Sequence, residues 1–374
     1  MRVAVNALPI NNFSGRRVLL GHLRNLAAAS NRRHSFHVLH HAGNRDLRCD
    51  LGPNVEWIEC AGVGSRWLGR LVWEATRMRR QLRLLGADRL ISTSGALVPF
   101  AGVPQWVWAQ NPWCFFPAFH FGIGDRIKAR LQRIGYAAAQ RHAQAMFYLS
   151  DYMARCYAEN AQATAIHGAT TYVGVDDDIF AAAADRLDFD ARELEIVTLS
   201  VMTPHKAIED CVDALALLHS RGILARLALV GPWSDPQYRL EIEVRVARLA
   251  LAPYVEISGA VDQAKLMSHY RRARVFCLMS RCESFGIPAV EAQAFGTPSV
   301  VADACAPPEV AGPGGRVVAP GDIAGAADAL AALLVDREQW QVASAAALRN
   351  VERFRWGRVS QPMIDWLDQS GDLT

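Results

Sequence analysis

Short apolar runs alternate with amphipathic helical patterns along the first half of the chain. Each run is rich in β-branched, aromatic or leucine side chains and is bounded by polar or glycine-containing segments, which is typical of a β-strand. The predicted strands are residues 2–8, 35–41, 89–95, 105–111, 145–150 and 164–170. Helical patterns separate several of them, so the order of elements predicts a parallel sheet with helices on both faces.

The second half of the chain repeats this alternation. Its predicted strands are residues 195–201, 225–231, 254–259, 274–280, 298–303 and 315–320, again with helical patterns between most of them. Residues 176–194 are acidic and poor in large apolar side chains, and we interpret them as the link between two domains.

The sequence therefore predicts the α/β fold class, with two doubly wound Rossmann-like domains that face each other across a cleft. We place them at residues 1–180 and 181–355. A chain of 374 residues is long for one core, which agrees with two domains. Ligands of such sheets bind beyond the carboxyl ends of the strands, so the loops at those ends are the places to search for chemistry.

Other bulk features exclude several classes of protein. No apolar run is long enough to span a membrane, and the N-terminus has no pattern of basic then apolar residues typical of a signal segment. The eight cysteines form no CxxC pair, so neither a zinc site nor a disulfide framework is predicted. We expect a cytoplasmic protein.

The net charge of +3 conceals an asymmetry between the halves. Residues 1–180 carry 21 Lys/Arg against 12 Asp/Glu, whereas the rest carries 19 against 25. A basic half indicates an anionic partner, either a membrane surface or a phosphorylated substrate, although compositional drift toward arginine explains it equally well.

Residues 66–86 combine a helical stripe of apolar side chains with six arginines and two tryptophans. An ordinary packed surface helix is the simpler interpretation. The alternative is peripheral docking on the inner face of an anionic membrane that holds a lipid-linked acceptor.

The loop after the first strand contains Gly15, at the predicted start of a helix near Arg16. A glycine there lets backbone amides approach a ligand, and a helix N-terminus favours an anion. The segment is not GxGxxG, so no dinucleotide fingerprint is present, and a plain turn is an equally good interpretation.

Lys206 follows strand 195–201 and lies at the mouth of the next predicted helix. A lysine at a helix N-terminus opposes the macrodipole, which is unfavourable unless an anion lies between them. This position suggests phosphate binding, with His205 as a second donor. The alternative is a solvated surface lysine.

The stretch "SRCESFGIPAVEAQAFG" follows strand 274–280 and contains two glutamates. Glu283 lies in the predicted loop, and Glu291 lies within the first turn or so of a helix that Pro288 helps to begin. Both can face one concavity, and the amides of Phe285 and Gly286 would be available there to an anion. A helix dipole alone would favour an acid at Glu291 but would not account for Glu283.

Two further patterns resemble metal sites but favour other interpretations. The run of three aspartates at 176–178 is better read as a turn and helix cap than as a DxD motif. Three histidines at 37, 40 and 41 run along a strand, where neighbours point to opposite faces. We expect no metal.

Taken together, the motifs resemble those of the retaining glycosyltransferases of family four. The frame "ESFGIPAVEAQAFGTPSVVAD" with "PPEVAG", the segment "HKAIEDCVDALALL", the segment "VGVDDDIF" and the terminal "RFRWGRVSQPMIDWLDQ" match that family in order and spacing. The first half is similar only loosely, as expected if it binds a variable acceptor.

The resemblance implies the glycosyltransferase-B fold, with residues 356–374 as a helix that crosses back to the first domain. It also implies sugar transfer from a nucleotide diphosphate donor with retention of configuration and without a metal or other cofactor.

Roles for individual residues follow from the same resemblance. Glu283 would bind the donor sugar, Glu291 the ribose hydroxyls, and Lys206 the diphosphate. The implied donor-binding set also contains His205, Gly15, Ser284, Phe285, Gly286, Gly259, Val261, Gln110 and Asn111.

The chain departs from the family pattern at two positions. Val201 stands where the family often carries an arginine, and His205 would replace that charge only in part. Gln110 or Asn111 stands where a histidine is often found, and neither amide can take a proton.

Three hypotheses follow from these motifs. The first is a hexosyltransferase, with a mannosyl donor as first candidate and a glycan or lipid-linked acceptor, in surface polysaccharide, lipopolysaccharide or glycolipid assembly. The second is a nucleotide-sugar epimerase. The third is a catalytically impaired sugar-nucleotide-binding protein on the same fold. No nucleic-acid partner is expected.

Overall fold

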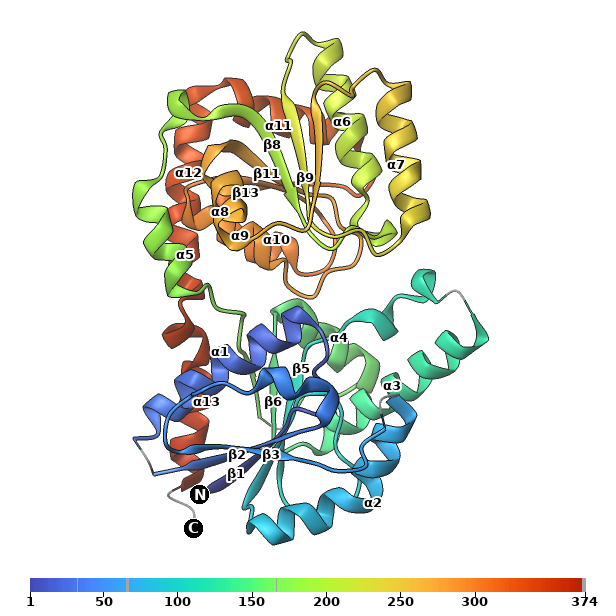
Figure 1. The fold of residues 1–374 in the computed structure, drawn as a ribbon, viewed down its shortest axis with the longest axis vertical. Helices are drawn as coiled ribbons and strands as arrows, with labels where there is room; N and C mark the ends of the chain where they lie inside the picture. The colour runs from blue at the N-terminus through green and yellow to red at the C-terminus, as the bar shows by residue number, and fades with distance from the viewer. Residues whose placement is uncertain (32, 65–66, 121, 166, 372–374) are drawn as a thin grey trace. The chain divides into compact units, whose positions relative to one another are not determined.

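The computed structural model describes residues 1–31, 33–64, 67–120, 122–165 and 167–371. The chain forms two compact units (Figure 1). Unit 1 contains residues 1–174 and the segment from Trp356 onward, and unit 2 contains Val175–Arg355.

Within the described residues, unit 1 is built on a seven-stranded parallel sheet of order β3-β2-β1-β4-β5-β6-β7 (Figure 1). Its strands are β1 (Arg2–Asn6), β2 (Ser35–His40), β3 (Val55–Glu59), β4 (Arg89–Ser92), β5 (Gln105–Ala109), β6 (Ala145–Tyr148) and β7 (Gly168–Thr170). The interior strands β4 and β6 are buried throughout, because helices cover both faces of the sheet. The sequence of β6, AMFY, is apolar throughout, whereas β4, RLIS, has a polar residue at each end.

The helices of unit 1 lie in the segments that the sequence pattern assigns to them. They are α1 (Phe13–Ala29), α2 (Trp67–Leu85), α3 (Ile123–His142), α4 (Asp151–Ala161) and α13 (Trp356–Gly371), with 3-10 turns η1 (Ala42–Leu47), η2 (Trp113–Phe115) and η3 (Pro117–Phe119). Helix α13 packs against α1 and so returns the end of the chain to unit 1.

The sequence reading misses strand β3. This strand lies at the edge of the sheet and pairs only with β2 among the described strands. None of its residues is fully buried, so its sequence VEWIE lacks the continuous apolar character of the interior strands. An edge strand with one solvated face is therefore the element that a search for apolar runs overlooks.

Unit 2, whose residues are all described, has a six-stranded parallel sheet of order β10-β9-β8-β11-β12-β13. Its strands are β8 (Glu193–Leu199), β9 (Arg226–Val230), β10 (Val255–Gly259), β11 (Ala273–Leu278), β12 (Ser299–Ala302) and β13 (Gly315–Val318). Each strand was predicted, with ends that differ by a few residues at most.

The helices of unit 2 separate these strands and pack on the sheet. They are α5 (Asp177–Ala182), α6 (Ile208–Ser220), α7 (Pro236–Arg248), α8 (Gln263–Arg272), α9 (Ile287–Ala294), α10 (Pro307–Ala311), α11 (Ile323–Val335) and α12 (Arg337–Val351). The 3-10 turns are η4 (Ala183–Asp185), η5 (Phe189–Ala191), η6 (Pro204–Lys206), η7 (Gly312–Gly314) and η8 (Glu352–Phe354).

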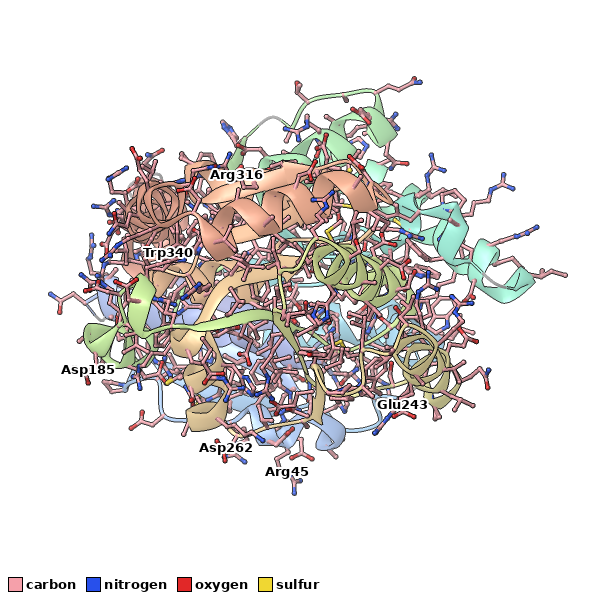
Figure 2. The ribbon with its side chains drawn as sticks, turned by 90° about the horizontal axis from the view of Figure 1, so that it is seen from above. Arg45, Asp185, Glu243, Asp262, Arg316 and Trp340 are labelled. Carbon is pink, nitrogen blue, oxygen red and sulfur yellow. The ribbon has the colours of Figure 1, made fainter. Side chains whose placement is uncertain are left out.

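The prediction that residues 176–194 link the domains is wrong, because this segment belongs to unit 2. Its few large apolar residues are buried, among them Ile179 and Phe189. The Phe189 ring lies 5.6 Å from the ring of Trp340, which Figure 2 labels. The chain divides instead after Gly174 and after Arg355, so the predicted boundary at residue 180 falls inside α5.

His22 occupies the middle of the contact between α1 and α13. It is buried between Trp108 and Trp356, with ring centroids 5.5 and 5.2 Å away, and its Nδ1 lies 3.0 Å from the Ser360 hydroxyl. Burial, only partly offset by hydrogen bonds to the backbone, lowers the pKa of His22 to about 4. The imidazole is therefore neutral at pH 7.

This buried histidine predicts a loss of stability in mild acid. Since its pKa in the folded chain lies below the value of 6.5 expected when unfolded, His22 destabilises unit 1 as pH falls from about 6.5 toward 4. The expected contribution at pH 5 is about 2 kcal/mol. Urea unfolding of His22→Gln should show a weaker dependence on pH than the parent, whereas His142→Gln, at an exposed histidine of α3, should not. Equal pH dependence of unfolding in the parent and both variants would contradict this role of His22.

Candidate functional site

Two loops of unit 2 bring Lys206 and Glu283 together. Strands β8 and β11 are parallel neighbours, so the loops at their carboxyl ends lie side by side. The Lys206 ammonium forms an ion pair with Glu283 Oε2, and the two side chains are only 12% and 19% exposed. The sequence predicted each residue as functional, and the structure adds that they contact each other directly.

Hydrogen bonds between the two loops fix this contact. The Arg281 amide donates to the His205 carbonyl at 2.8 Å. The buried Ser280 hydroxyl lies 3.1 Å from the Cys282 carbonyl and 3.3 Å from that of His205. The segment directly before Glu283 is thus anchored to the backbone directly before Lys206.

Lys206 lies just before helix α6, at the mouth of that helix as predicted. It ends the 3-10 turn η6, and Ala207 in the left-handed region (φ 50°) separates it from α6. The anion that a lysine here requires is present within the chain, because Glu283 supplies it. The pair is an acceptor and a cation held at one point, where an incoming phosphate would compete with the carboxylate for the ammonium.

His205 does not supply the charge that is absent at Val201. Burial, and then the neighbouring Lys206 ammonium, lower the pKa of His205 to about 4, so the ring is neutral at pH 7. Thr203 Oγ1 lies 3.1 Å from its Nδ1. Val201 is 52% exposed. Lys206 is therefore the cation of this loop, and the neutral His205 ring can contribute only an uncharged hydrogen-bonding group to a ligand.

Glu291 lies in helix α9, one turn past its start. Gly286 begins the helix with φ +94°, a conformation that glycine adopts without strain, and Pro288 occupies the first turn. The Glu291 side chain is only 5% exposed, and its Oε2 accepts a hydrogen bond from the Tyr270 hydroxyl at 2.9 Å. Tyr270 is a partner that the sequence reading missed, since it lies in α8, far from the motif.

The short segment between the two glutamates has a packed side and a more accessible side. The Phe285 ring is buried, 5.5 Å from the ring of Phe354 in an edge-on contact. Ser284 is half-buried. Because Phe285 fills the core, the backbone of Ser284–Gly286 is held in place by packing as well as by the helix that follows.

Cys282 precedes Glu283 but has no nucleophilic character. A hydrogen bond with the Cys305 thiol, and then burial, raise the pKa of Cys282 well above its usual value. It stays a neutral thiol at pH 7, and only the thiolate is an effective nucleophile.

Gly259 is the last residue of β10 and Val261 lies just after it, at the carboxyl end of the outermost strand of the same sheet. Gly259 has φ +65°, and its carbonyl accepts a hydrogen bond from the Gly231 amide at 2.7 Å. Val261 is half-buried. The sequence reading missed Gly231, although a glycine directly after strand β9 is the kind of signal that marks such a position.

The interpretation of Gly15 as an anion-binding amide needs correction. Helix α1 begins at Phe13, before the predicted start near Arg16, because Asn12 caps it. The Gly15 amide donates to Asn12 Oδ1 at 2.7 Å, and a Cβ on Gly15 would lie 2.8 Å from that same oxygen. The glycine is explained by the cap, and its amide is already used.

Gln110 and Asn111 follow strand β5 of unit 1. Gln110 Nε2 is buried and has no hydrogen-bond partner among the described residues, which is uncommon for a buried amide. Asn111 Oδ1 accepts from the Trp113 amide at 2.9 Å. Gln110 thus has a buried donor that a ligand could use, whereas Asn111 uses its acceptor oxygen in the turn.

The aspartate and histidine runs form no metal centre in the part of the chain that the structure describes. No group of three or more His, Cys, Asp or Glu side chains is arranged to hold an ion there. Asp176 is the residue before α5, and Asp178 Oδ1 accepts from the Ile179 amide at 2.8 Å. His41 caps the turn η1, and His37 contacts Glu56.

Among known proteins, the sequence similarity of this chain to a protein family lies in unit 2. Residues 181–349 match the family described as glycosyl transferases group 1. The chain is 32% identical over 197 residues to the MMP alpha-(1->4)-mannosyltransferase of Mycolicibacterium hassiacum, across 51% of this chain and 46% of that protein. It is 35% identical over 167 residues to the phosphatidyl-myo-inositol mannosyltransferase of Mycobacterium leprae, across 43% and 42%. The chain spans less than half the length of these relatives.

Solved structures extend the likeness to the whole chain. Sucrose-phosphate synthase from Thermosynechococcus elongatus superposes with a TM-score of 0.79 at 19% identity over 100% of both chains. Anabaena HepE in complex with UDP-glucose gives 0.74 at 19% identity over 99% and 100%. Residues 181–349 are thus similar in sequence to the group 1 glycosyl transferases, and the whole chain has the predicted glycosyltransferase-B fold.

Proposed function

We propose that the protein is a retaining hexosyltransferase of family four, which moves a hexose from a nucleotide diphosphate sugar to a glycan or lipid-linked acceptor. The observation that carries this proposal is the Lys206–Glu283 pair at the carboxyl ends of β8 and β11. A cation and an acceptor held together at this edge of the sheet suit a ligand that joins a diphosphate to a sugar.

Each part of such a donor has a matching group in unit 2. Lys206 neutralises the diphosphate, and the amides near Phe285 and Gly286 assist it. Glu283 accepts hydrogen bonds from the sugar hydroxyls, and Glu291, positioned by Tyr270, accepts them from the ribose. The Gly259–Val261 turn contacts the base.

The chemistry needs charge stabilisation more than a protein base. As the bond from the sugar to the phosphate breaks, a new bond forms to the acceptor oxygen on the same face. The acceptor proton passes to an oxygen of the departing diphosphate. Lys206 stabilises the charge that develops on this leaving group, and a low-exposure site strengthens that interaction. No protein nucleophile is required, in agreement with the raised pKa of Cys282.

Two of the named relatives support mannose as the sugar. Both are mannosyltransferases, one acting on MMP and one on phosphatidyl-myo-inositol. Surface polysaccharide, lipopolysaccharide or glycolipid assembly in the cytoplasm is the setting we propose, with the chain peripheral on the inner face of the membrane.

A thermal-shift screen with GDP, UDP, GDP-mannose and UDP-glucose tests donor binding. A ligand at 100 times its Kd stabilises the folded chain by about 2.7 kcal/mol, which shifts the midpoint by several degrees. If none of these compounds raises the melting temperature, the proposal fails. Incubation of the best donor alone then identifies an epimerase, which converts the sugar. Incubation of the donor with an acceptor separates a transferase from an impaired binding protein, which leaves the donor unchanged.

Lys206 itself gives a direct test of diphosphate binding. Lys206→Met should weaken the affinity for the nucleoside diphosphate by about 100-fold, because it removes the ammonium and leaves Glu283 unneutralised beside the phosphates. Lys265→Met, at an exposed lysine of α8, is the control and should bind as the parent does. Isothermal titration calorimetry measures both, and equal affinities for the two variants would count against the assignment.

Helix α2 remains a proposed membrane contact, but with fewer exposed apolar side chains than the sequence predicts. The structure buries Trp73, whose indole donates to the Ala61 carbonyl at 3.0 Å, and also Met78 and Leu82 of the predicted stripe. Leu68 and Val72 near its start are exposed.

A further inference from the structure

Helix α3 of unit 1 has a row of aliphatic side chains in solvent. Ile123, Ile127, Leu131 and Ile134 are between 50% and 78% exposed. Their spacing of four, four and three residues places them on one face of the helix. Figure 1 shows α3 reaching away from the body of unit 1. Isolated exposed aliphatics are ordinary on a protein surface, but four in one row form a continuous apolar ridge.

The ridge is not an incompletely packed core face. The opposite face of α3 is the one that packs on the unit, and it buries Ala129, Tyr136 and Ala139 against the neighbouring η2 and α4. The Tyr136 ring stacks on that of Tyr157, with centroids 4.7 Å apart. Because this buried face satisfies the fold, the ridge has to be explained by something outside the unit.

Basic side chains flank the ridge. Successive residues of a helix are 100° apart, which puts Arg126, Arg130 and Arg133 along one side of the ridge and Lys128 along the other. Asp125 is the only acidic residue of α3. An apolar stripe with a row of arginines along one side and a lysine on the other is the pattern of a helix that lies in the interface of an anionic bilayer.

A recess beside the arginine row has the chemistry to hold lipid phosphates. It has a volume of about 550 Å³ and is lined by Arg126, Arg130, Arg133 and Arg141, together with Ile134 of the ridge. Arg133 donates to Asn160 Oδ1 at 3.0 Å, while Arg126 and Arg130 are exposed. Guanidinium groups are well suited to phosphate, so acidic headgroups can lie next to the inserted aliphatics.

Aromatic side chains precede α3 and extend the same pattern. Trp113, Phe116 and Phe119 are half-buried, and the Lys128 ammonium lies 4.7 Å from the Trp113 ring. Tryptophan beside a basic residue is common at the boundary between lipid and water. In the described part of the chain, no helix has both the length and the apolar character needed to cross a bilayer.

We propose that the face of α3 formed by Ile123, Ile127, Leu131 and Ile134 docks on an anionic lipid bilayer, with the arginine row bound to lipid phosphates. A second copy of the chain fits this face less well, because a two-fold contact would place one arginine row near the other. This surface rests on the peripheral membrane setting of the proposed function and names the face that would make the contact. Its test needs neither a donor nor an acceptor, so it can fail separately from the transfer reaction.

Co-sedimentation of the full chain with vesicles tests the docking surface. The protein should bind vesicles of phosphatidylcholine with 30% phosphatidylglycerol and should not bind pure phosphatidylcholine. Ile127→Ser with Leu131→Ser should weaken this binding on the order of 100-fold, because two inserted aliphatics are lost. Leu240→Ser with Val244→Ser is the matched control, at 52% and 58% exposed aliphatics one turn apart on α7, and should bind like the parent.

The charged row has its own pair of variants. Arg126→Gln with Arg130→Gln should weaken binding by about 30-fold, since each basic side chain near an anionic surface contributes about fivefold. Arg248→Gln with Arg349→Gln removes the same charge from exposed positions of α7 and α12 and should have no effect.

Three results would overturn the proposal. They are equal binding of both kinds of vesicle, equal losses in the α3 and control variants, and no vesicle binding together with a dimer that Ile127→Ser dissociates in size-exclusion chromatography with light scattering. The last would assign the face to a second copy. Donor turnover without acceptor should be the same in the α3 variants as in the parent, which keeps this test independent of the transferase assignment.

Discussion

Glu283→Gln is expected to reduce sugar transfer by about 10³-fold or more while the chain stays folded. The substitution keeps the size of the side chain but removes the charge that pairs with Lys206 and one of the two equivalent acceptor oxygens. The donor sugar then loses its orientation relative to the acceptor, and Lys206 loses the contact that holds its ammonium at the phosphate position. The loss should therefore appear mainly in kcat.

The measurement is steady-state transfer from the donor found in the thermal-shift screen, with circular dichroism melting to verify folding. Glu309→Gln is the matched control, because Glu309 is also a half-buried glutamate of unit 2 but lies in the first turn of α10. It should retain most of the activity. If Glu283→Gln turns over like the parent, the assignment of this glutamate to the donor sugar is wrong.

The parts of the site that the sequence predicts are those that lie within one loop and its flanking strand. Glu283, Gly286 and Glu291 belong to a single strand–loop–helix segment, so a local reading identifies the loop and the start of α9. Lys206 is separate in sequence, yet its place after a predicted strand is sufficient to bring it to the same sheet edge.

The contacts that refine these roles depend on side-chain packing between distant segments. The bond from Tyr270 to Glu291, the ion pair of Lys206 with Glu283 and the neutral state of His205 each depend on burial. Periodicity gives no information on any of them. A local hydrogen bond explains why α1 begins earlier than predicted, since Asn12 caps the helix and accepts from the Gly15 amide.

The same limit applies to the fold. Interior strands of a parallel sheet are apolar on both faces and are recognised from sequence, whereas the edge strand β3 is not. The acidic segment at 176–194 was assigned by its average composition. A few buried contacts, such as that of Phe189 with Trp340, outweigh this average and make the segment part of unit 2.

Gly231→Ala is expected to destabilise unit 2 by about 4 kcal/mol, the largest effect on stability that we predict. Gly231 has φ +135°, a conformation that side chains with a Cβ rarely adopt, and a Cβ there would overlap the Ser200 carbonyl oxygen. That oxygen belongs to the backbone just after β8 and cannot move without disturbing the sheet. The Gly231 amide also donates to the Gly259 carbonyl, so the turn that we propose contacts the base should loosen as well.

Gly222→Ala separates the two causes of this loss. Gly222 also has a positive φ (+80°), but a Cβ there meets no atom within 4 Å, so the substitution costs only the backbone strain of about 1–2 kcal/mol. Urea unfolding of both variants gives the difference, which measures the overlap with Ser200 together with the greater backbone strain at φ +135°. Equal losses would mean that strand β9 shifts to accommodate the methyl group. In that case Gly231→Ala should still weaken binding of the nucleoside diphosphate, because the shift displaces the turn that Gly231 anchors.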